Sequence, residues 1–214
     1  MNATQDRYWD NPRQEMARLV SETSKVILDV GCNTGTFGAS LKQSRKIEIW
    51  GIEPNPVTAE KAQSVLDHVI CGFFSNEIDL PDSYFDAIVM NDVLEHMPDP
   101  WAALHLAKRK LAPNGTIIAS IPNIRQIDNL LHIIIDKDFR YEANGIRDST
   151  HLRFFTRISA IRLFEECGFE IQHIEGIHET WWTKSLLRRL AYRIFPKALE
   201  DTKYIQYAFI ASVR

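Results

Sequence analysis

The sequence predicts an α/β fold with a mostly parallel sheet, helices on both faces and a small cap. Short apolar segments alternate with segments of helical periodicity, which is typical of parallel strands connected by helices. The first apolar segment ends in a glycine-rich loop that leads into a helix. A length of 214 residues and a hydrophobic content of 45% suffice for one sizeable core.

Apolar segments at regular intervals predict the strands. Five of them are short and largely apolar, and the first looks like a buried parallel strand. These runs span residues 25–30, 47–53, 68–71, 85–90 and 116–121. Two further strands are predicted over residues 170–177 and 204–213.

The segments between the strands predict helices over residues 11–23, 35–43, 56–66, 99–111, 159–167 and 183–195. Pro56 and Pro100 stand in first turns, where the missing N–H of proline costs nothing. Gly115 and Gly168 follow helix ends, as the residue after a helix often does. Residues 124–156 show no clear period and are predicted to form a cap or lid. We expect residues 1–214 to form one domain that carries this cap and a helical insertion at 181–197.

Composition narrows the class of protein. A net charge of −3 provides no global basic field for nucleic acid, so we expect no nucleic-acid partner. Cys32, Cys71 and Cys167 are too scattered for a disulfide framework or a zinc site, and we expect buried, reduced thiols. The first residues are polar and no apolar run approaches the roughly 20 residues of a membrane span. These features together predict a cytoplasmic protein.

The loop after the first strand carries the strongest functional signal. Gly31, Gly35 and Gly38 follow the spacing G-x-x-x-G-x-x-G at the start of a helix, where backbone can approach a ligand closely. Glu53 ends the second strand, where a carboxylate can accept both hydroxyls of an adenosine ribose. The spacing favours a ligand without a pyrophosphate. A simple tight turn and a solvated carboxylate are the alternatives.

Four ordered motifs resemble those of class I S-adenosylmethionine (SAM)-dependent methyltransferases. They are VILDVGCNTG at 26–35, GIEP at 51–54, FDAIVMNDVLEH at 85–96 with PDP at 98–100, and LAPNG at 111–115 with SIPN at 120–123. The resemblance implies a Rossmann-like, seven-stranded sheet with a late antiparallel strand, and SAM as the cofactor.

The resemblance also implies which residues bind the cofactor. The residues expected around the methionine part of SAM are Asp29, Gly31, Cys32, Asn33 and Gly35. Glu53 is expected to hold the ribose, with Pro54 beside the adenine, and Asn91, Asp92 and Val93 to line the pocket. Phe73 or Phe74 would stack on the adenine, because the acid common in the family after the third strand is absent. Arg13 would pair with the methionine carboxylate, unless it is an ordinary surface arginine.

Three residues are predicted to be catalytic, namely Glu95, His96 and His151. Histidine suits a general base near neutral pH, as methylation of a hydroxyl requires. His151 lies in DSTHLRFFT at 148–156, which resembles a subgroup linked with sugar and cell-surface glycan pathways, and Asp148 is expected to hold its ring. The alternative is that these residues only brace their loops. We predict no metal, although Asp92, Glu95 and His96 resemble the metal-binding segment of ubiquinone-biosynthesis O-methyltransferases.

Residues 181–197 predict an amphipathic helix with a basic side. Trp181, Leu186, Leu187, Leu190, Ile194 and Phe195 fall at helical spacing, and Lys184, Arg188, Arg189, Arg193 and Lys197 accompany them. We favour an apolar stripe that packs on the domain or forms a homodimer seam. Peripheral contact with an anionic membrane is the alternative.

The predicted function is transfer of a methyl group from SAM to an oxygen or nitrogen of a small or glycan-type acceptor. A non-catalytic SAM-binding or scaffold protein is one alternative, because binding and catalysis use different residues. A nicotinamide-dependent oxidoreductase is the other, although the glycine spacing disfavours it.

Overall fold

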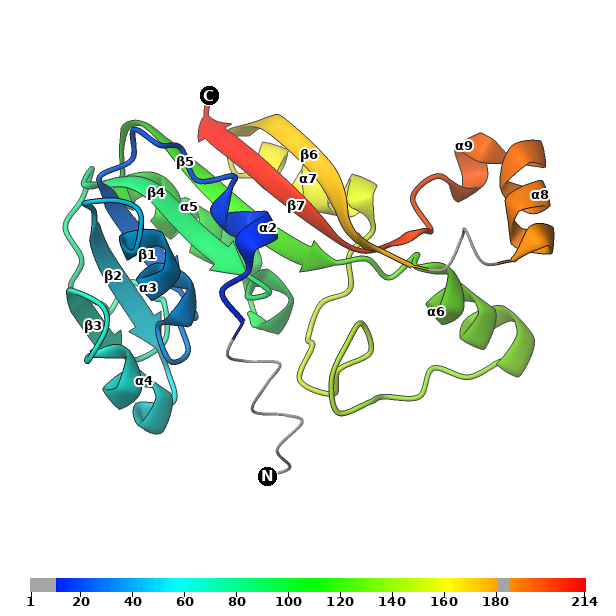
Figure 1. Cartoon of the computed structure of the whole chain (residues 1–214), viewed down its shortest axis with the longest axis horizontal. Coiled ribbons are helices and arrows are strands. Elements are labelled where there is room, and N and C mark those ends of the chain that lie inside the picture. Colours follow the sequence, from blue (N-terminus) through cyan, green and yellow to red (C-terminus); the bar gives the residue numbers. More distant parts are fainter. Residues whose placement is uncertain (1–10, 181–184) are drawn as a thin grey trace.

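The computed structural model describes residues 11–180 and 185–214. It contains a seven-stranded sheet with the order β3-β2-β1-β4-β5-β7-β6 (Figure 1). The strands are β1 (Val26–Val30), β2 (Glu48–Glu53), β3 (His68–Cys71), β4 (Phe85–Asn91), β5 (Leu111–Pro122), β6 (Phe169–Glu179) and β7 (Tyr204–Val213). Strands β1 to β5 pair in parallel, whereas β7 lies antiparallel between β5 and β6. The predicted late antiparallel strand is thereby confirmed.

Helices cover both faces of the sheet, as predicted. They are α2 (Gln14–Ala17), α3 (Thr36–Lys42), α4 (Pro56–Ala62), α5 (Pro100–Lys110) and α7 (Arg157–Glu166). Alternate residues of the central strands belong to two cores: Leu28 and Ile88 pack with α5 and α7, whereas Ile27 and Val89 pack with α2 and α3. Side chains on a strand point to opposite faces in turn, so each buried strand contributes to both cores.

The helix predicted over residues 11–23 is much shorter in the structure. Only Gln14–Ala17 is helical, and the backbone then continues in tight turns, with Leu19 N donating to Met16 O and Val20 N to Ala17 O. Met16 and Val20 are nevertheless buried against the sheet. The apolar spacing thus predicted the burial of Met16 and Val20, but this burial does not require a continuous helix.

The predicted cap consists of α6 (Ile127–Leu131), the π-helical turn η2 (His132–Asp136) and a long irregular segment. An isolated bridge between Asn123, directly after β5, and Phe155 returns this segment to the sheet, and a second between Glu142 and Asp148 closes a loop within the cap. Beyond β6, α8 (Leu186–Ile194) and α9 (Pro196–Leu199) form a projection beside α6, far from β3 (Figure 1).

Two expectations from composition can be compared with the structure. Cys32 and Cys167 are buried, as predicted, but Cys71 is exposed because it ends the edge strand β3. None of the helices within residues 11–180 and 185–214 combines the length and the apolar character that a membrane crossing requires.

Candidate active site

The candidate site lies at the carboxyl ends of β1, β2 and β4. The chain order of the sheet reverses at β1, because β2 and β3 lie on one side of it and β4 and β5 on the other. Open α/β sheets bind ligands at such a switch point, where the loops on either side diverge. The glycine loop after β1 and Glu53 at the end of β2 therefore meet at the expected edge.

Two glycines of the loop adopt backbone conformations that suit no other residue there. Gly31 has φ +73°, and a Cβ on it would lie 2.8 Å from Val93 Cγ2, in the loop after β4. Gly35 has φ +82° at the N-cap of α3, and a Cβ there would lie 2.7 Å from Val65 Cγ2. Asn33, between them, has φ 50°, which asparagine tolerates better than most residues. The loop is thus packed tightly against its neighbours as well as being sharply turned.

Glu53 connects the glycine loop to the end of β2. Its carboxylate accepts hydrogen bonds from the backbone N–H of Asn33 at 3.0 Å and from that of Asn55 at 2.9 Å. Only 9% of Glu53 is exposed. These two donors fix the carboxylate at the lip of the loop, in the position from which a ribose could be held.

Buried oxygens without partners gather at the same edge of the sheet. Within the described residues, Asp29 Oδ2, Asn33 Oδ1, Asn91 Oδ1 and both Glu95 side-chain oxygens accept no hydrogen bond. Burial, and then the neighbouring Glu53 carboxylate, raise the pKa of Asp29 to about 8. Since buried polar atoms are normally paired, this concentration of unpaired acceptors fits a polar ligand such as the amino-acid and ribose parts of SAM.

Arg13 is engaged differently from the prediction. Its Nη1 donates to Asp92 Oδ2 at 2.5 Å, its Nε to Glu15 at 2.6 Å, and its Nη2 to Ser120 and Gln206. All three nitrogens are therefore paired within the protein, which leaves no fork of two N–H groups for the carboxylate of the cofactor. In this structure Arg13 instead orients Asp92, which has φ 54° directly after β4.

The adenine side of the site is partly different from the prediction. Phe74 is buried in the core with Leu80. Phe73 is 77% exposed and remains the candidate for stacking. Pro54 is exposed immediately after Glu53.

The three predicted catalytic residues come together although they lie in distant parts of the sequence. Glu95 and His96 form the short helix η1 (Leu94–His96), and His151 belongs to the cap. The rings of His96 and His151 lie 4.6 Å apart between centroids, and the backbone O of Glu95 accepts from the N–H groups of Leu152 and Arg153. The cap is therefore attached by its backbone to the loop that follows β4.

The environment of His151 favours its neutral form. Burial is the main effect that lowers its pKa, although the hydrogen bond to the Ile146 carbonyl opposes it. Nδ1 lies 3.1 Å from Ile146 O, so this nitrogen carries the proton and Nε2 keeps its lone pair. Asp148 does not hold the ring, contrary to prediction, because its Oδ1 accepts from Thr150 N and Oγ1 instead.

The same three residues have the geometry of a possible cation site. One ligand atom from each of Glu95, His96 and His151 lies within 4.8 Å of the others. Asp92, which belongs to the metal-binding segment that the sequence resembles, is instead paired with Arg13. Burial, and then the Asp92 carboxylate, raise the pKa of Glu95 well above its ordinary value.

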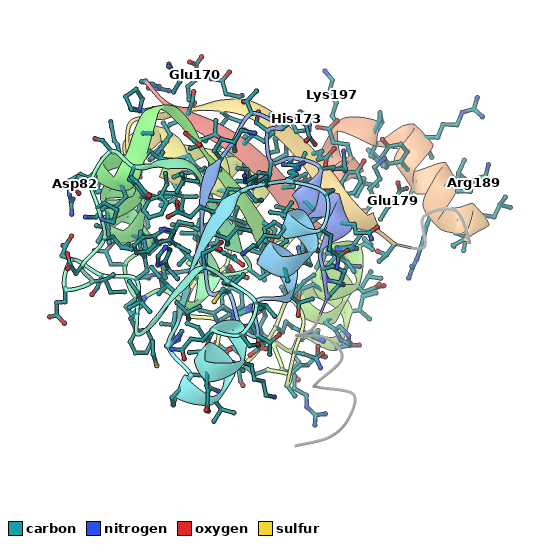
Figure 2. The ribbon with its side chains drawn as sticks, turned by 60° about the vertical axis from the view of Figure 1, so that its left-hand side comes forward. Asp82, Glu170, His173, Glu179, Arg189 and Lys197 are labelled. Carbon is teal, nitrogen blue, oxygen red and sulfur yellow. The ribbon has the colours of Figure 1, made fainter. Side chains whose placement is uncertain are left out.

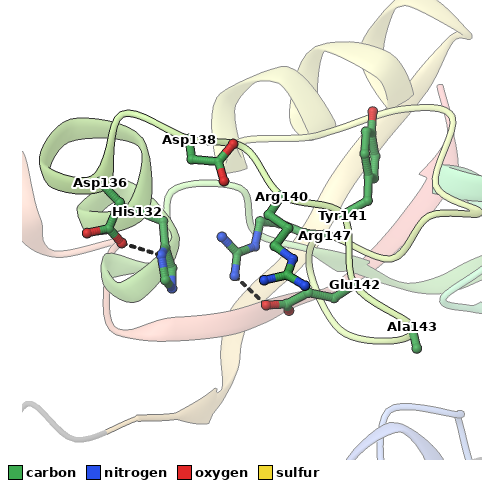
Figure 3. A pocket seen from close by; sticks show the side chains of 8 residues that line it. All are labelled: His132, Asp136, Asp138, Arg140, Tyr141, Glu142, Ala143 and Arg147. Atoms are coloured by element: carbon green, nitrogen blue, oxygen red, sulfur yellow. Dashed lines mark hydrogen bonds and ion pairs between the residues drawn. The ribbon is translucent and has the colours of Figure 1, made fainter.

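A cavity in the cap has no counterpart in the sequence-based prediction. It has a volume of about 560 Å³ and is lined by charged and aromatic side chains, among them His132, Asp136, Arg140, Tyr141 and Arg147 (Figure 3). The centroid of the Phe154 ring lies 6.3 Å from those of both the Tyr141 and the His151 rings, so this side chain lies between one wall of the cavity and His151. The irregular backbone of residues 137–148 gave no periodic signal by which this cavity could be found.

The strand order, the glycine loop and Glu53 define a class I SAM-dependent methyltransferase domain. The chain belongs to the methyltransferase-domain family, whose model matches residues 1–174. SAM is accordingly the cofactor implied for this site, and the family match favours a methyltransferase over the nicotinamide-dependent alternative.

Individual relatives agree with this family. The chain is 30% identical over 131 residues to an O-methyltransferase, resE, of Aspergillus sclerotiorum, with 51% of this chain and 50% of that protein covered. It is 24% identical over 162 residues to a ubiquinone biosynthesis O-methyltransferase of Aliivibrio fischeri, with 72% and 68% covered. The chain thus spans about half the length of the first of these relatives, and neither is named for a glycan acceptor.

A solved structure shares the fold. It is a SAM-dependent methyltransferase from Archaeoglobus fulgidus, with a TM-score of 0.68, 21% identity and 94% of each chain covered. At this level of identity the likeness concerns the fold alone. The likeness therefore does not identify the acceptor of this chain.

Proposed function

We propose that residues 1–214 form one domain that transfers a methyl group from SAM to an oxygen or nitrogen of a small or glycan-type acceptor. The observation that carries the proposal is the meeting of His96 and His151 at the loop after β4, the same loop whose Val93 packs against Gly31. A non-catalytic SAM-binding protein would have no need of two histidines brought from distant segments to the cofactor edge. The convergence therefore supports an enzyme.

The residues at the strand ends fit the cofactor. The loop from Gly31 to Gly35 admits it closely, Glu53 takes the ribose hydroxyls, and Phe73 with Pro54 flanks the adenine. Asp29, Asn33 and Asn91 offer unpaired oxygens to its polar groups, with Cys32, Asp92 and Val93 as further lining. When bound, SAM supplies an electrophilic methyl group on a sulfonium, so the protein needs mainly to position the acceptor.

His151 would accept the proton of the acceptor. The hydrogen bond of Nδ1 to Ile146 O leaves the Nε2 lone pair available, and the lowered pKa keeps the ring neutral near pH 7. His96 packs against this ring and is held by Thr150, so it acts as a positioning residue. Glu95 is buried, and one of its carboxyl oxygens lies within 4.8 Å of a ring nitrogen of each histidine, so it would act as a further positioning residue.

The cap cavity is the proposed acceptor site. Tyr141 offers an aromatic face, and Arg140, Asp136 and Asp138 offer charged hydrogen-bonding groups, a combination that suits a polyhydroxylated ring (Figure 3). The names of the relatives support an oxygen acceptor, and the sequence pattern at 148–156 supports the glycan-type. The net charge of −3 disfavours nucleic acid.

The first experiment is calorimetric titration of the purified chain with S-adenosylhomocysteine. We expect binding in the micromolar range, about −8 kcal/mol. In Glu53→Ala, binding should weaken by ~100-fold, because the charged acceptor for the ribose and a brace of the loop are both lost. Glu60→Ala, at an exposed position of α4, is the matched control and should bind as the native chain does.

Two results would overturn the proposal. If the folded native chain binds no S-adenosylhomocysteine, the cofactor is wrong, and nicotinamide cofactors would be titrated next. If it binds but transfers no methyl group to any sugar, glycan or phenolic acceptor, the non-catalytic alternative is favoured.

A further inference from the structure

Helix α8 exposes an apolar face that the domain does not cover. Leu186, Leu187, Leu190 and Ile194 are 81%, 79%, 54% and 58% exposed, and Phe195, directly after the helix, is 60% exposed. At about 3.6 residues per turn, the four helical residues lie on one side of α8. The prediction that this stripe packs on its own domain is therefore wrong. Trp181 and Lys184 lie outside the described residues.

The polar side of α8 is the side that contacts the domain. Arg188 pairs with Asp128 of α6 at 3.5 Å, and Lys203 lies 5.8 Å from the centre of the Tyr192 ring. Arg188 and Tyr192 are one turn apart and lie away from the leucines. A helix held by its polar residues, with its apolar residues directed outward, is oriented for a partner outside the domain.

The charge of the segment identifies that partner. Residues 185–197 contain Arg188, Arg189, Arg193 and Lys197 and no acidic residue, within a chain of net charge −3. Arg189 and Lys197 lie on the projection formed by α8 and α9, away from Asp82 (Figure 2). A symmetric contact between two copies would bring two such basic segments together, whereas anionic lipid headgroups would neutralise them. We propose that α8 docks the protein on an anionic membrane surface, with its leucines entering the headgroup region.

The turn η2 of the cap, which directly follows α6, also exposes apolar residues and adjoins the acceptor cavity. Ile134 and Ile135 of η2 are 68% and 66% exposed, and His132 and Asp136 of the same turn line the cavity. Docking would thus hold the cavity close to the membrane. Resting on the proposed methyl transfer, this placement points to an acceptor that is carried on a lipid.

The test is co-sedimentation of the full chain with vesicles. Vesicles of phosphatidylcholine with one third phosphatidylglycerol would be compared with pure phosphatidylcholine, at low and at high salt. We expect binding to the anionic vesicles that weakens in high salt, because surface charges are then screened. Two double variants should each lower the partition coefficient of the protein between vesicles and solution at least ~10-fold. They are Leu187→Asp/Leu190→Asp and Arg189→Glu/Arg193→Glu.

Matched controls separate this proposal from the proposed enzyme function. Ile158→Asp removes an equally exposed apolar residue of α7, and Lys61→Glu/Arg162→Glu reverses two exposed charges elsewhere, so both should sediment as the native chain does. All variants should keep their affinity for S-adenosylhomocysteine. Absence of the native chain from the anionic pellet at low salt would overturn the proposal, even if the cofactor binds. So would a dimer that Leu187→Asp/Leu190→Asp dissociates without any vesicle binding.

Discussion

The imidazole rings of His96 and His151 lie 4.6 Å apart between their centroids and are inclined at 76°. One ring belongs to the loop after β4 and the other to the cap, so the contact joins the edge of the sheet to the cap. A general base is useful only if its lone pair faces the acceptor, and the hydrogen bond from His151 to Ile146 O fixes which nitrogen is free.

Replacement of His151 by alanine should lower turnover by ~100-fold or more, because the acceptor then has no base. Binding of S-adenosylhomocysteine should be unchanged, since His151 lies in the cap and not in the glycine loop. Single-turnover methyl transfer and calorimetry would measure the two effects. His173→Ala, at a half-exposed position of β6, is the control.

The pH dependence gives a second readout of the same role. A base must be neutral to act, so activity should rise with pH through the pKa of His151 and then level off. Burial lowers that pKa, so the rise should lie below the ordinary histidine value of about 6.5. Full activity of His151→Ala, with the native pH profile, would refute the assignment.

Asp29 should make the stability of the cofactor-free protein fall as pH rises. Its pKa is raised to about 8 in the folded chain, against about 3.9 when unfolded, so between these values the folded state holds an extra proton. The stabilising contribution is complete below pH 4 and is lost as the pH approaches 8. In Asp29→Asn this part of the slope should vanish in urea unfolding measured from pH 5 to 8. An unchanged slope would mean that Asp29 is ionised in the folded state.

Gly35→Ala should be more damaging than Gly145→Ala. Both glycines have positive φ, at +82° and +85°, and a side chain there costs about 1–2 kcal/mol. A Cβ on Gly145 would meet nothing within 4 Å, whereas one on Gly35 would meet Val65 at 2.7 Å and add about 1–3 kcal/mol. Urea unfolding of both variants measures the difference. Equal losses would show that Val65 and its neighbours move aside without cost.

Methyl transfer should persist after exhaustive dialysis against EDTA. Glu95, His96 and His151 have the spacing of a metal site, but the proposed proton transfer to His151 requires no cation. Assays before and after dialysis, followed by addition of Mg²⁺ or Zn²⁺, measure this directly. Activity that is lost on chelation and restored by one of these ions would assign the cluster to a cation instead.

The sequence predicted the centre of the sheet well because β1 and β4 are buried on both faces. Largely apolar segments such as β1 and β4 are stable only in the interior of the protein. Gly31 directly follows β1 and Asn91 is the last residue of β4, so these two residues mark where the strands end. Residues 11–23 were less predictable, since burial of Met16 and Val20 is compatible with either a helix or a series of tight turns. The residues of the glycine loop were predictable for another reason: a sharp turn at a strand end favours glycine or asparagine, which tolerate positive φ.

Local sequence thus determined the fold class, the position of the cofactor edge and the residue types that surround it. Only the tertiary structure decided that His96 meets His151, that Arg13 is paired with Asp92, and that the apolar side of α8 faces outward. These three relationships depend on contacts between segments that are distant in the chain. Hydrophobic periodicity shows which face of a segment is apolar. What packs against that face depends on the shape and the charges of the rest of the molecule.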